Sequence, residues 1–197
     1  RGSAILLALI LVLSLSVPAL AADTAAEQAA YTAASYAAQY SGAESVQYAV
    51  WYKGETVLTG HVGSYSRTEN RALTDDILYG TGSVSKMYTT VAVMQLAEAG
   101  KLSLDAPVTR YLKDFKMADE RYKQITVRML LNHSSGLMGS TMDSGMLFDD
   151  PDRSATEDLL ERLSTQRLKA DPGAYSVYCN DGFTLAELVV EAVSGKS

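Results

Sequence analysis

Residues 79–112 read YGTGSVSKMYTTVAVMQLAEAGKLSLDAPVTRYL, and this stretch combines the longest predicted helix with a candidate reactive pair. From Ser83 to Ala99 apolar residues recur at helical spacing, and Gly100 is a typical helix stop, so we predict a helix there. Ser83 and Lys86 lie three residues apart at its start, which places both side chains on one face. Unpaired N–H groups at a helix N-terminus stabilise developing negative charge. The stretch therefore predicts a serine activated by a neighbouring lysine, in a setting suited to acyl transfer.

A second set of polar residues lies where the last predicted helix, Asn180 to Val193, begins. Tyr178 precedes this helix, and a phenol beside a lysine cation has its ionised form favoured, so Tyr178 is a candidate proton carrier for Ser83. Asn180 offers amide donors and an acceptor, which suit a peptide-like group on a substrate. Each pattern alone also has a structural interpretation, with Ser83 and Asn180 as helix caps and Lys86 as a solvated charge.

The other elements are predicted from hydrophobic periodicity and from turn residues. They are a helix over residues 24–40, a hairpin with strands over 45–51 and 55–62, a short buried helix over 125–132, a loop over 138–152 and a charged helix over 156–168. We expect Tyr31, Tyr36 and Tyr40 to pack the first helix onto something larger, and Thr126 to cap the short helix. No repeat and no Pro- or Gly/Ser-rich linker divides the chain, so one domain is expected.

Three blocks of sequence resemble one known family, in order and in wording. They are the 79–112 stretch, ITVRMLLNHSSGL at 125–137 and PGAYSVYCNDGFTLAELVVEAVSGKS at 172–197. Together they resemble the serine β-lactamase-like family, which includes class C β-lactamases, D-alanyl-D-alanine carboxypeptidases and related esterases. The resemblance covers residues 45–197. It implies an α/β (α+β) fold, with an antiparallel sheet flanked by helices, a helical subdomain, and the site between them.

The resemblance also implies roles for the candidate residues. Ser83 would be the acylated nucleophile, and its backbone N–H would supply half of the oxyanion hole. Lys86 would help to deprotonate Ser83, and Tyr178 would act as the general base and acid. Asn180 would hold Lys86 and the substrate amide. The HSSG block at 133–136 resembles a structural stretch of the family, and no catalytic role is assigned to it.

Two features depart from the family pattern. The family's third motif, a Lys or His followed by a small residue and Gly on a later strand, does not occur before Ser197. We therefore expect residues 22–197 to be the N-terminal portion of a longer domain, incomplete at its C-terminal end and inactive as a fragment. Cys179 stands where relatives carry a small residue such as Ser or Ala, and it is expected to behave as a small buried hydrophobe.

The first residues have the pattern of an export signal. Residues 4–13 read AILLALILVL, and Pro18 and the Ala19-Leu20-Ala21 triplet follow. A short apolar run closed by an A-x-A pattern is typical of a secretory signal peptide, and the run is shorter than the ~20 residues that span a bilayer. We expect residues 1–21 to be removed and the protein to be secreted, periplasmic or on the cell surface. An uncleaved membrane anchor is the alternative.

Composition excludes several classes of function. The 197 residues include 17 Lys+Arg and 23 Asp+Glu, and the net charge is −6. An acidic chain without a basic stripe is not expected to bind nucleic acid or an anionic membrane surface, so an uncleaved signal anchor would be its one link to a membrane. One cysteine and two histidines predict neither an internal disulfide nor a metal site, and no cofactor is expected.

These observations and the resemblance predict an exported serine hydrolase that works through an acyl-serine intermediate. Its partner would be a small molecule or a peptidoglycan peptide, and its substrate a β-lactam, a D-Ala-D-Ala-type peptide or an ester. The sequence does not choose among these. The alternative is a non-catalytic binding or regulatory module on the same scaffold.

Overall fold

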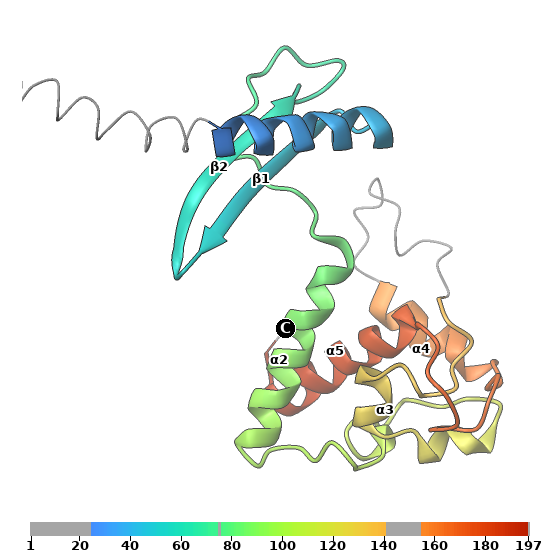
Figure 1. Ribbon diagram of the computed structural model, residues 1–197. Helices are drawn as coiled ribbons and strands as arrows, with labels where there is room; N and C mark the ends of the chain where they lie inside the picture. The colour runs from blue at the N-terminus through green and yellow to red at the C-terminus, as the bar shows by residue number, and fades with distance from the viewer. Residues whose placement is uncertain (1–24, 75, 141–154, 197) are drawn as a thin grey trace, which may run out of the picture. The chain divides into compact units, whose positions relative to one another are not determined.

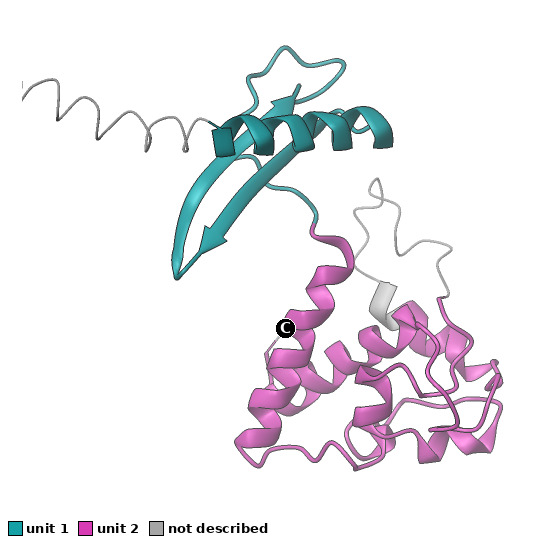
Figure 2. Ribbon diagram, viewed as in Figure 1, with its two compact units in different colours: residues 1–80 teal, residues 81–197 magenta. Residues whose placement is uncertain are grey.

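The computed structural model describes residues 25–74, 76–140 and 155–196 of the chain. Residues 1–80 and 81–197 form two compact units, coloured teal and magenta in Figure 2. These units are set by contacts within the chain, and the single domain expected from the sequence stays a prediction. The boundary at Gly80 has no compositional mark, because it depends on which residues contact one another and not on a Pro- or Ser-rich linker. The expected signal peptide, residues 1–21, lies outside the described residues.

The predicted hairpin is confirmed in the first unit. Strands β1 (Ser45–Tyr52) and β2 (Glu55–Gly63) pair antiparallel through the two-residue turn Lys53-Gly54 (Figure 1). Both turn residues have positive φ, 51° and 93°, as a type I′ turn requires. Tyr48 lies opposite Gly60, and a Cβ added to Gly60 would lie 2.4 Å from the Tyr48 hydroxyl oxygen. In this conformation the Tyr48 ring occupies the space that a side chain at position 60 would take.

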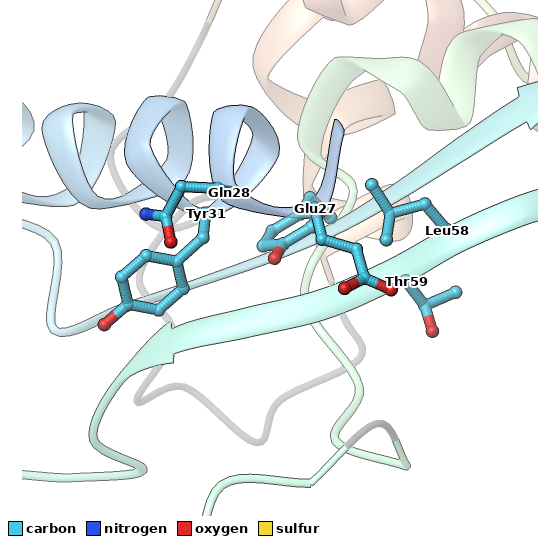
Figure 3. A pocket seen from close by; sticks show the side chains of 6 residues that line it. Glu27, Gln28, Tyr31, Leu58 and Thr59 are labelled. Carbon is cyan, nitrogen blue, oxygen red and sulfur yellow. The ribbon is translucent and has the colours of Figure 1, made fainter. Parts of the chain in front are cut away.

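A helix over residues 25–41 lies beside this hairpin, close to its predicted bounds (Figure 1). Its buried residue is Ala34, whereas Tyr36 and Tyr40 are exposed and their rings stack with centroids 5.7 Å apart. The expected packing role of these two tyrosines is therefore wrong within the described residues. Helical spacing places the small side chains on the inner face instead. Tyr31 lines an open hollow of about 420 Å³ between the helix and the hairpin (Figure 3).

The second unit is helical in its described part. Its elements are the 3₁₀ turn η1 (Gly82–Val84), α2 (Ser85–Glu98), the 3₁₀ turns η2 (Val108–Arg110) and η3 (Glu120–Gln124), α3 (Val127–Leu131), α4 (Ala155–Ser164) and α5 (Asn180–Ser194). α5 packs against α2, α3 and α4 (Figure 1). Fully buried apolar side chains from these helices form the core, among them Val93, Leu130, Leu163, Leu185 and Val189.

The ends of these helices agree with the sequence in part. Gly100, with φ at 69°, follows α2 as predicted, and the Thr126 hydroxyl accepts the Met129 N–H as the predicted cap of α3. The charged helix ends at Ser164, four residues before its predicted end, because Leu168 is buried from a non-helical segment. The two 3₁₀ turns η2 and η3 were not predicted, since one turn is too short to show a period. Most of the predicted 138–152 loop lies outside the described residues.

Among the described helices, none combines the length and the apolar composition needed to cross a membrane.

Candidate active site

The four candidate residues come together inside the second unit. Ser83 lies in η1, so it precedes α2 and does not belong to its first turn as predicted. Lys86 is the second residue of α2, and Asn180 is the first residue of α5. Tyr178 lies two residues before that helix. Since α2 packs against α5, residues more than 90 positions apart in sequence meet at the start of both helices.

Hydrogen bonds connect all four side chains. The Ser83 Oγ and the Tyr178 Oη are 2.5 Å apart. The Lys86 Nζ donates to the Ser83 Oγ at 3.3 Å and to the Asn180 Oδ1 at 2.7 Å. Lys86 therefore contacts both the hydroxyl group and the amide, and it is partly buried while Ser83 is exposed.

The electrostatic setting favours the ionised form of Tyr178. Hydrogen bonding with the Lys86 ammonium group is the largest influence and that with the Ser83 hydroxyl the next, and both lower the pKa of the Tyr178 phenol. The Lys86 Nζ also lies 5.0 Å from the centroid of the Tyr178 ring. About half of the surface of Tyr178 is exposed. The arrangement can move a proton between Ser83 and Tyr178 beside a fixed positive charge.

Ser140 is a member of the site that the sequence analysis missed. Its Oγ accepts a hydrogen bond from the Asn180 Nδ2 at 2.8 Å, so the Asn180 amide oxygen is directed toward Lys86. The preceding carbonyl, that of Gly139, accepts from the Cys179 Sγ at 3.0 Å and from the Asp181 N–H at 3.2 Å. A serine inside a polar loop has no distinguishing pattern, so only the folded chain identifies it.

Cys179 is buried, as expected of a small hydrophobe, with 1% of its surface exposed. Burial raises the pKa of its thiol. The Sγ also accepts the Gly182 N–H at 3.4 Å, so Cys179 is the N-cap of α5 between Tyr178 and Asn180. A buried thiol without a lowered pKa is not a reactive nucleophile.

His133 also lies at the site, although its sequence pattern predicts no catalytic role. Its ring centroid is 4.7 Å from that of Tyr178, and its Nδ1 accepts the Cys179 N–H at 3.1 Å. Within the described ranges, no group of three or more His, Cys, Asp or Glu side chains is arranged to hold a metal ion.

Comparison with known proteins extends the description of the chain. A family model described as Beta-lactamase matches residues 33–197. Penicillin-binding protein 4 of Amycolatopsis lactamdurans is 34% identical over 137 residues, which cover 68% of this chain and 35% of that protein. Esterase EstB of Burkholderia gladioli is 33% identical over 132 residues, which cover 61% of this chain and 34% of the esterase.

A solved structure shows the same fold. The crystal structure of a class C β-lactamase aligns with a TM-score of 0.67 and 23% identity over 83% of this chain and 43% of that one. It confirms the expected fold class, helices together with an antiparallel sheet. The chain spans about a third of the length of the curated relatives it matches. The family match includes Ser83, Lys86, Tyr178 and Asn180, and it extends over most of the sequence. The chain therefore belongs to the serine β-lactamase-like family.

Proposed function

We propose that this chain carries the nucleophile and the proton-transfer groups of a serine hydrolase that works through an acyl-serine intermediate. The observation that carries the proposal is the 2.5 Å distance between the Ser83 Oγ and the Tyr178 Oη, with the Lys86 ammonium group beside both. A serine becomes nucleophilic when a neighbouring base takes its proton as it attacks. This distance supports Tyr178 as that base.

Acylation begins when the Ser83 Oγ bonds to a substrate carbonyl carbon while its proton passes to the Tyr178 phenolate. The carbonyl electron pair moves to oxygen, where the backbone N–H of Ser83, in the 3₁₀ turn just before α2, helps to stabilise it. The tetrahedral adduct then collapses, and the leaving nitrogen or oxygen takes the proton from Tyr178. Water attacks the resulting ester in the same way, with Tyr178 again accepting and returning a proton.

Asn180 and Lys86 prepare the site for this sequence. The 2.7 Å hydrogen bond to the Asn180 Oδ1 holds the Lys86 ammonium group near both reacting oxygens, so its charge favours the phenolate. Ser140 holds the other end of the Asn180 amide in this structure. A substrate carbonyl that replaced the Ser140 hydroxyl would accept the same N–H, which gives Asn180 a binding role as well.

This chemistry specifies the reacting group of the substrate. The site requires an acyl carbonyl with a nitrogen or oxygen leaving group, which a β-lactam, a D-Ala-D-Ala-type peptide and an ester all provide. The matched relatives include a penicillin-binding protein and an esterase, which supports this group of substrates. We propose that the substrate is one of these three.

The test is the intact mass of the full-length gene product after incubation with benzylpenicillin and, separately, with a p-nitrophenyl ester. The wild type is expected to gain the mass of one acyl group or to turn the compound over, whereas Ser83→Ala does neither. Ser85→Ala is the matched control, because Ser85 lies two residues after Ser83 and its hydroxyl pairs with Thr81. An unchanged reaction of Ser83→Ala would refute the assignment. A wild type inert to both compounds and to a D-Ala-D-Ala peptide would favour the non-catalytic alternative.

A further inference from the structure

His133 contacts the backbone on both sides of Tyr178. Its carbonyl oxygen accepts the Val177 N–H at 2.9 Å, and its imidazole Nδ1 accepts the Cys179 N–H at 3.1 Å. Tyr178 is the residue between those two N–H groups. A single residue therefore fixes the chain immediately before and immediately after the phenol that faces Ser83.

The backbone of His133 is in an unusual conformation for a residue with a side chain. Its φ is +60°, in the left-handed region, at the position just beyond the C-terminal end of α3 where glycine or asparagine is usual. A left-handed backbone at a non-glycine residue costs free energy and persists where surrounding contacts require it. Here the two hydrogen bonds to the Tyr178 segment are such contacts, and only a residue with a side-chain acceptor provides both.

The ring of His133 adds contacts to these hydrogen bonds. Its centroid lies 4.7 Å from that of Tyr178 and 5.1 Å from that of Phe183, which is buried in α5. The ring is therefore held between the phenol and the core, and the partial burial of His133 restricts its rotation. Displacement of the ring would release the phenol together with its backbone.

We propose that neutral His133 is the positioning residue for Tyr178, and that protonation of its imidazole opens this contact and moves the phenol away from Ser83 and Lys86. The expected effect on acylation of Ser83 rests on the proposed function. The expected effect on the position of the Tyr178 phenol does not. An Nδ1 that accepts a hydrogen bond carries no proton, so the imidazole proton is on Nε2. In the imidazolium form both nitrogens are donors, and the Cys179 N–H would face another N–H.

The groups around the imidazole keep it neutral near pH 7. The titratable groups that face it are the Lys86 amine from α2 and the Tyr178 phenol from the segment before α5. Burial, first, and the Lys86 charge, second, lower the pKa of His133, and their effect exceeds that of the backbone contact with Cys179, which raises it. Since a lowered pKa favours the neutral form, the contact is present at neutral pH and is lost as the pH falls through that pKa.

Two substitutions separate the hydrogen bond from its titration. His133→Asn keeps an acceptor near the position of Nδ1, tolerates a left-handed backbone and does not titrate. His133→Leu keeps apolar bulk but removes the acceptor. His61→Asn is the control, because it replaces the other histidine, which lies on β2 in the first unit.

The first measurement needs no catalysis. In the full-length gene product labelled with ¹³C at tyrosine Cζ, with Tyr178→Phe to assign the signal, the phenol of Tyr178 is titrated. In the wild type and in His133→Asn, the Tyr178 phenol is expected to show the lowered pKa that contact with Lys86 causes. In His133→Leu, the pKa of this phenol is expected to move back up toward the ordinary value near 10. An unchanged Tyr178 pKa in a folded His133→Leu would overturn the positioning role, whether or not the protein is an enzyme.

The second measurement is the rate of Ser83 acylation between pH 4.5 and 8, by the probe that labels the wild type. His133→Leu is expected to acylate about 100-fold more slowly at pH 7.5, the cost of a small misplacement of a catalytic group. His133→Asn is expected to acylate at a rate near that of the wild type at pH 7.5. At low pH its acylation rate should lack the part of the decline that protonation of His133 causes in the wild type. Retention of the whole wild-type decline in His133→Asn would overturn the protonation step. A wild type that no probe labels would refute the proposed function, and the tyrosine titration would still decide the position of Tyr178.

Discussion

Tyr178 and Ser83 share one short hydrogen bond, so replacing the phenol tests its role with little change of shape. Tyr178→Phe removes the group that we propose accepts the Ser83 proton, and we expect acylation to slow by roughly 10²–10⁴-fold, the usual contribution of a general base. Stopped-flow acylation by the labelling probe measures the loss. Tyr175→Phe is the matched control, since Tyr175 is an exposed tyrosine in the same segment. A Tyr178→Phe rate within a few-fold of the wild type would exclude Tyr178 as the base.

The dependence of acylation on pH should reflect the influence of Lys86 on Tyr178. Lys86 lowers the pKa of the phenol, and the phenolate is the proposed base, so kcat/KM is expected to rise with pH up to that lowered pKa and then to level off. Lys86→Met removes the positive charge and should move the rise to higher pH while lowering the rate at pH 7. The pH–rate profiles of both proteins measure the shift. If the rise stayed at the same pH in Lys86→Met, another group would control it.

At the scale of single residues, the sequence predicts what is local. Ser83 and Lys86 are three positions apart, so helical geometry alone places them together. The approach of Tyr178 and Asn180 depends on contacts made over more than 90 residues, and the family resemblance, not spacing, predicted it. Ser140 and His133 contribute through a loop and through a left-handed backbone, which leave no periodic pattern in the sequence.

Among the elements, the turn after α3 depends on Gly136. Its φ is +78°, and an added Cβ would lie 2.4 Å from the Ala170 carbonyl oxygen. Gly136→Ala is therefore expected to destabilise the fold by at least about 2 kcal/mol, from backbone strain together with a backbone clash. Gly100→Ala is the control, because Gly100 has φ at +69° but no neighbour within 4 Å, and it should cost only ~1 kcal/mol. Urea unfolding measures both, and equal losses would contradict the clash.

Asp119 connects η3 to the segment that follows α4. Its carboxylate accepts from the Arg121 side chain, at 2.6 and 3.0 Å, and from the Leu168 N–H at 3.2 Å. These bonds, led by Arg121, hold the pKa of Asp119 well below its ordinary value. Because the pKa of Asp119 is lower in the folded protein than in the unfolded chain, its ionised carboxylate stabilises the fold at pH values above the unfolded-state pKa near 4. This stabilisation is lost as the pH falls toward the folded-state pKa.

Asp119→Asn should therefore lower the melting temperature by a few degrees at pH 7. The difference from the wild type should shrink below about pH 4, where the wild-type carboxylate begins to lose its advantage. Thermal unfolding followed by circular dichroism at several pH values measures this, and the exposed Asp114→Asn is the control. A difference that did not depend on pH would mean that shape, and not charge, accounts for the loss.

The elements were predictable to the extent that their periodicity is long. The hairpin, α2, α3 and α5 were expected close to their observed bounds, because alternation, caps and glycine stops mark them. η2 and η3 were not expected, and α4 ends early because buried contacts of Leu168 from an extended segment replace helical ones. Ala34, not the tyrosines, is buried on the first helix, since tertiary packing and not residue size selects the inner face.

For the whole molecule, we propose export and removal of residues 1–21. N-terminal sequencing of the protein recovered outside the cytoplasm should begin at Ala22, and replacing Ala19 and Ala21 by arginine should block the cleavage. Replacing Ser16 by arginine is the control, since it lies outside the A-x-A triplet. A membrane-bound protein that still contains residues 4–13 would support the anchor alternative, and a cytoplasmic one would refute export.

The fold class was predictable at this scale, but the division into two compact units was not. Three ordered blocks of sequence were enough to predict the family. The boundary at Gly80 depends on the numbers and positions of tertiary contacts, which composition does not encode.

The central claim is that Ser83 becomes acylated, and the most direct measurement is to locate the adduct. The full-length gene product is incubated briefly with the probe, quenched in acid, digested and analysed by tandem mass spectrometry. We expect the acyl group on Ser83, in a peptide that also contains Ser85 and Lys86 as internal controls. An adduct on Ser85, Lys86 or Tyr178, with Ser83 unmodified, would contradict it.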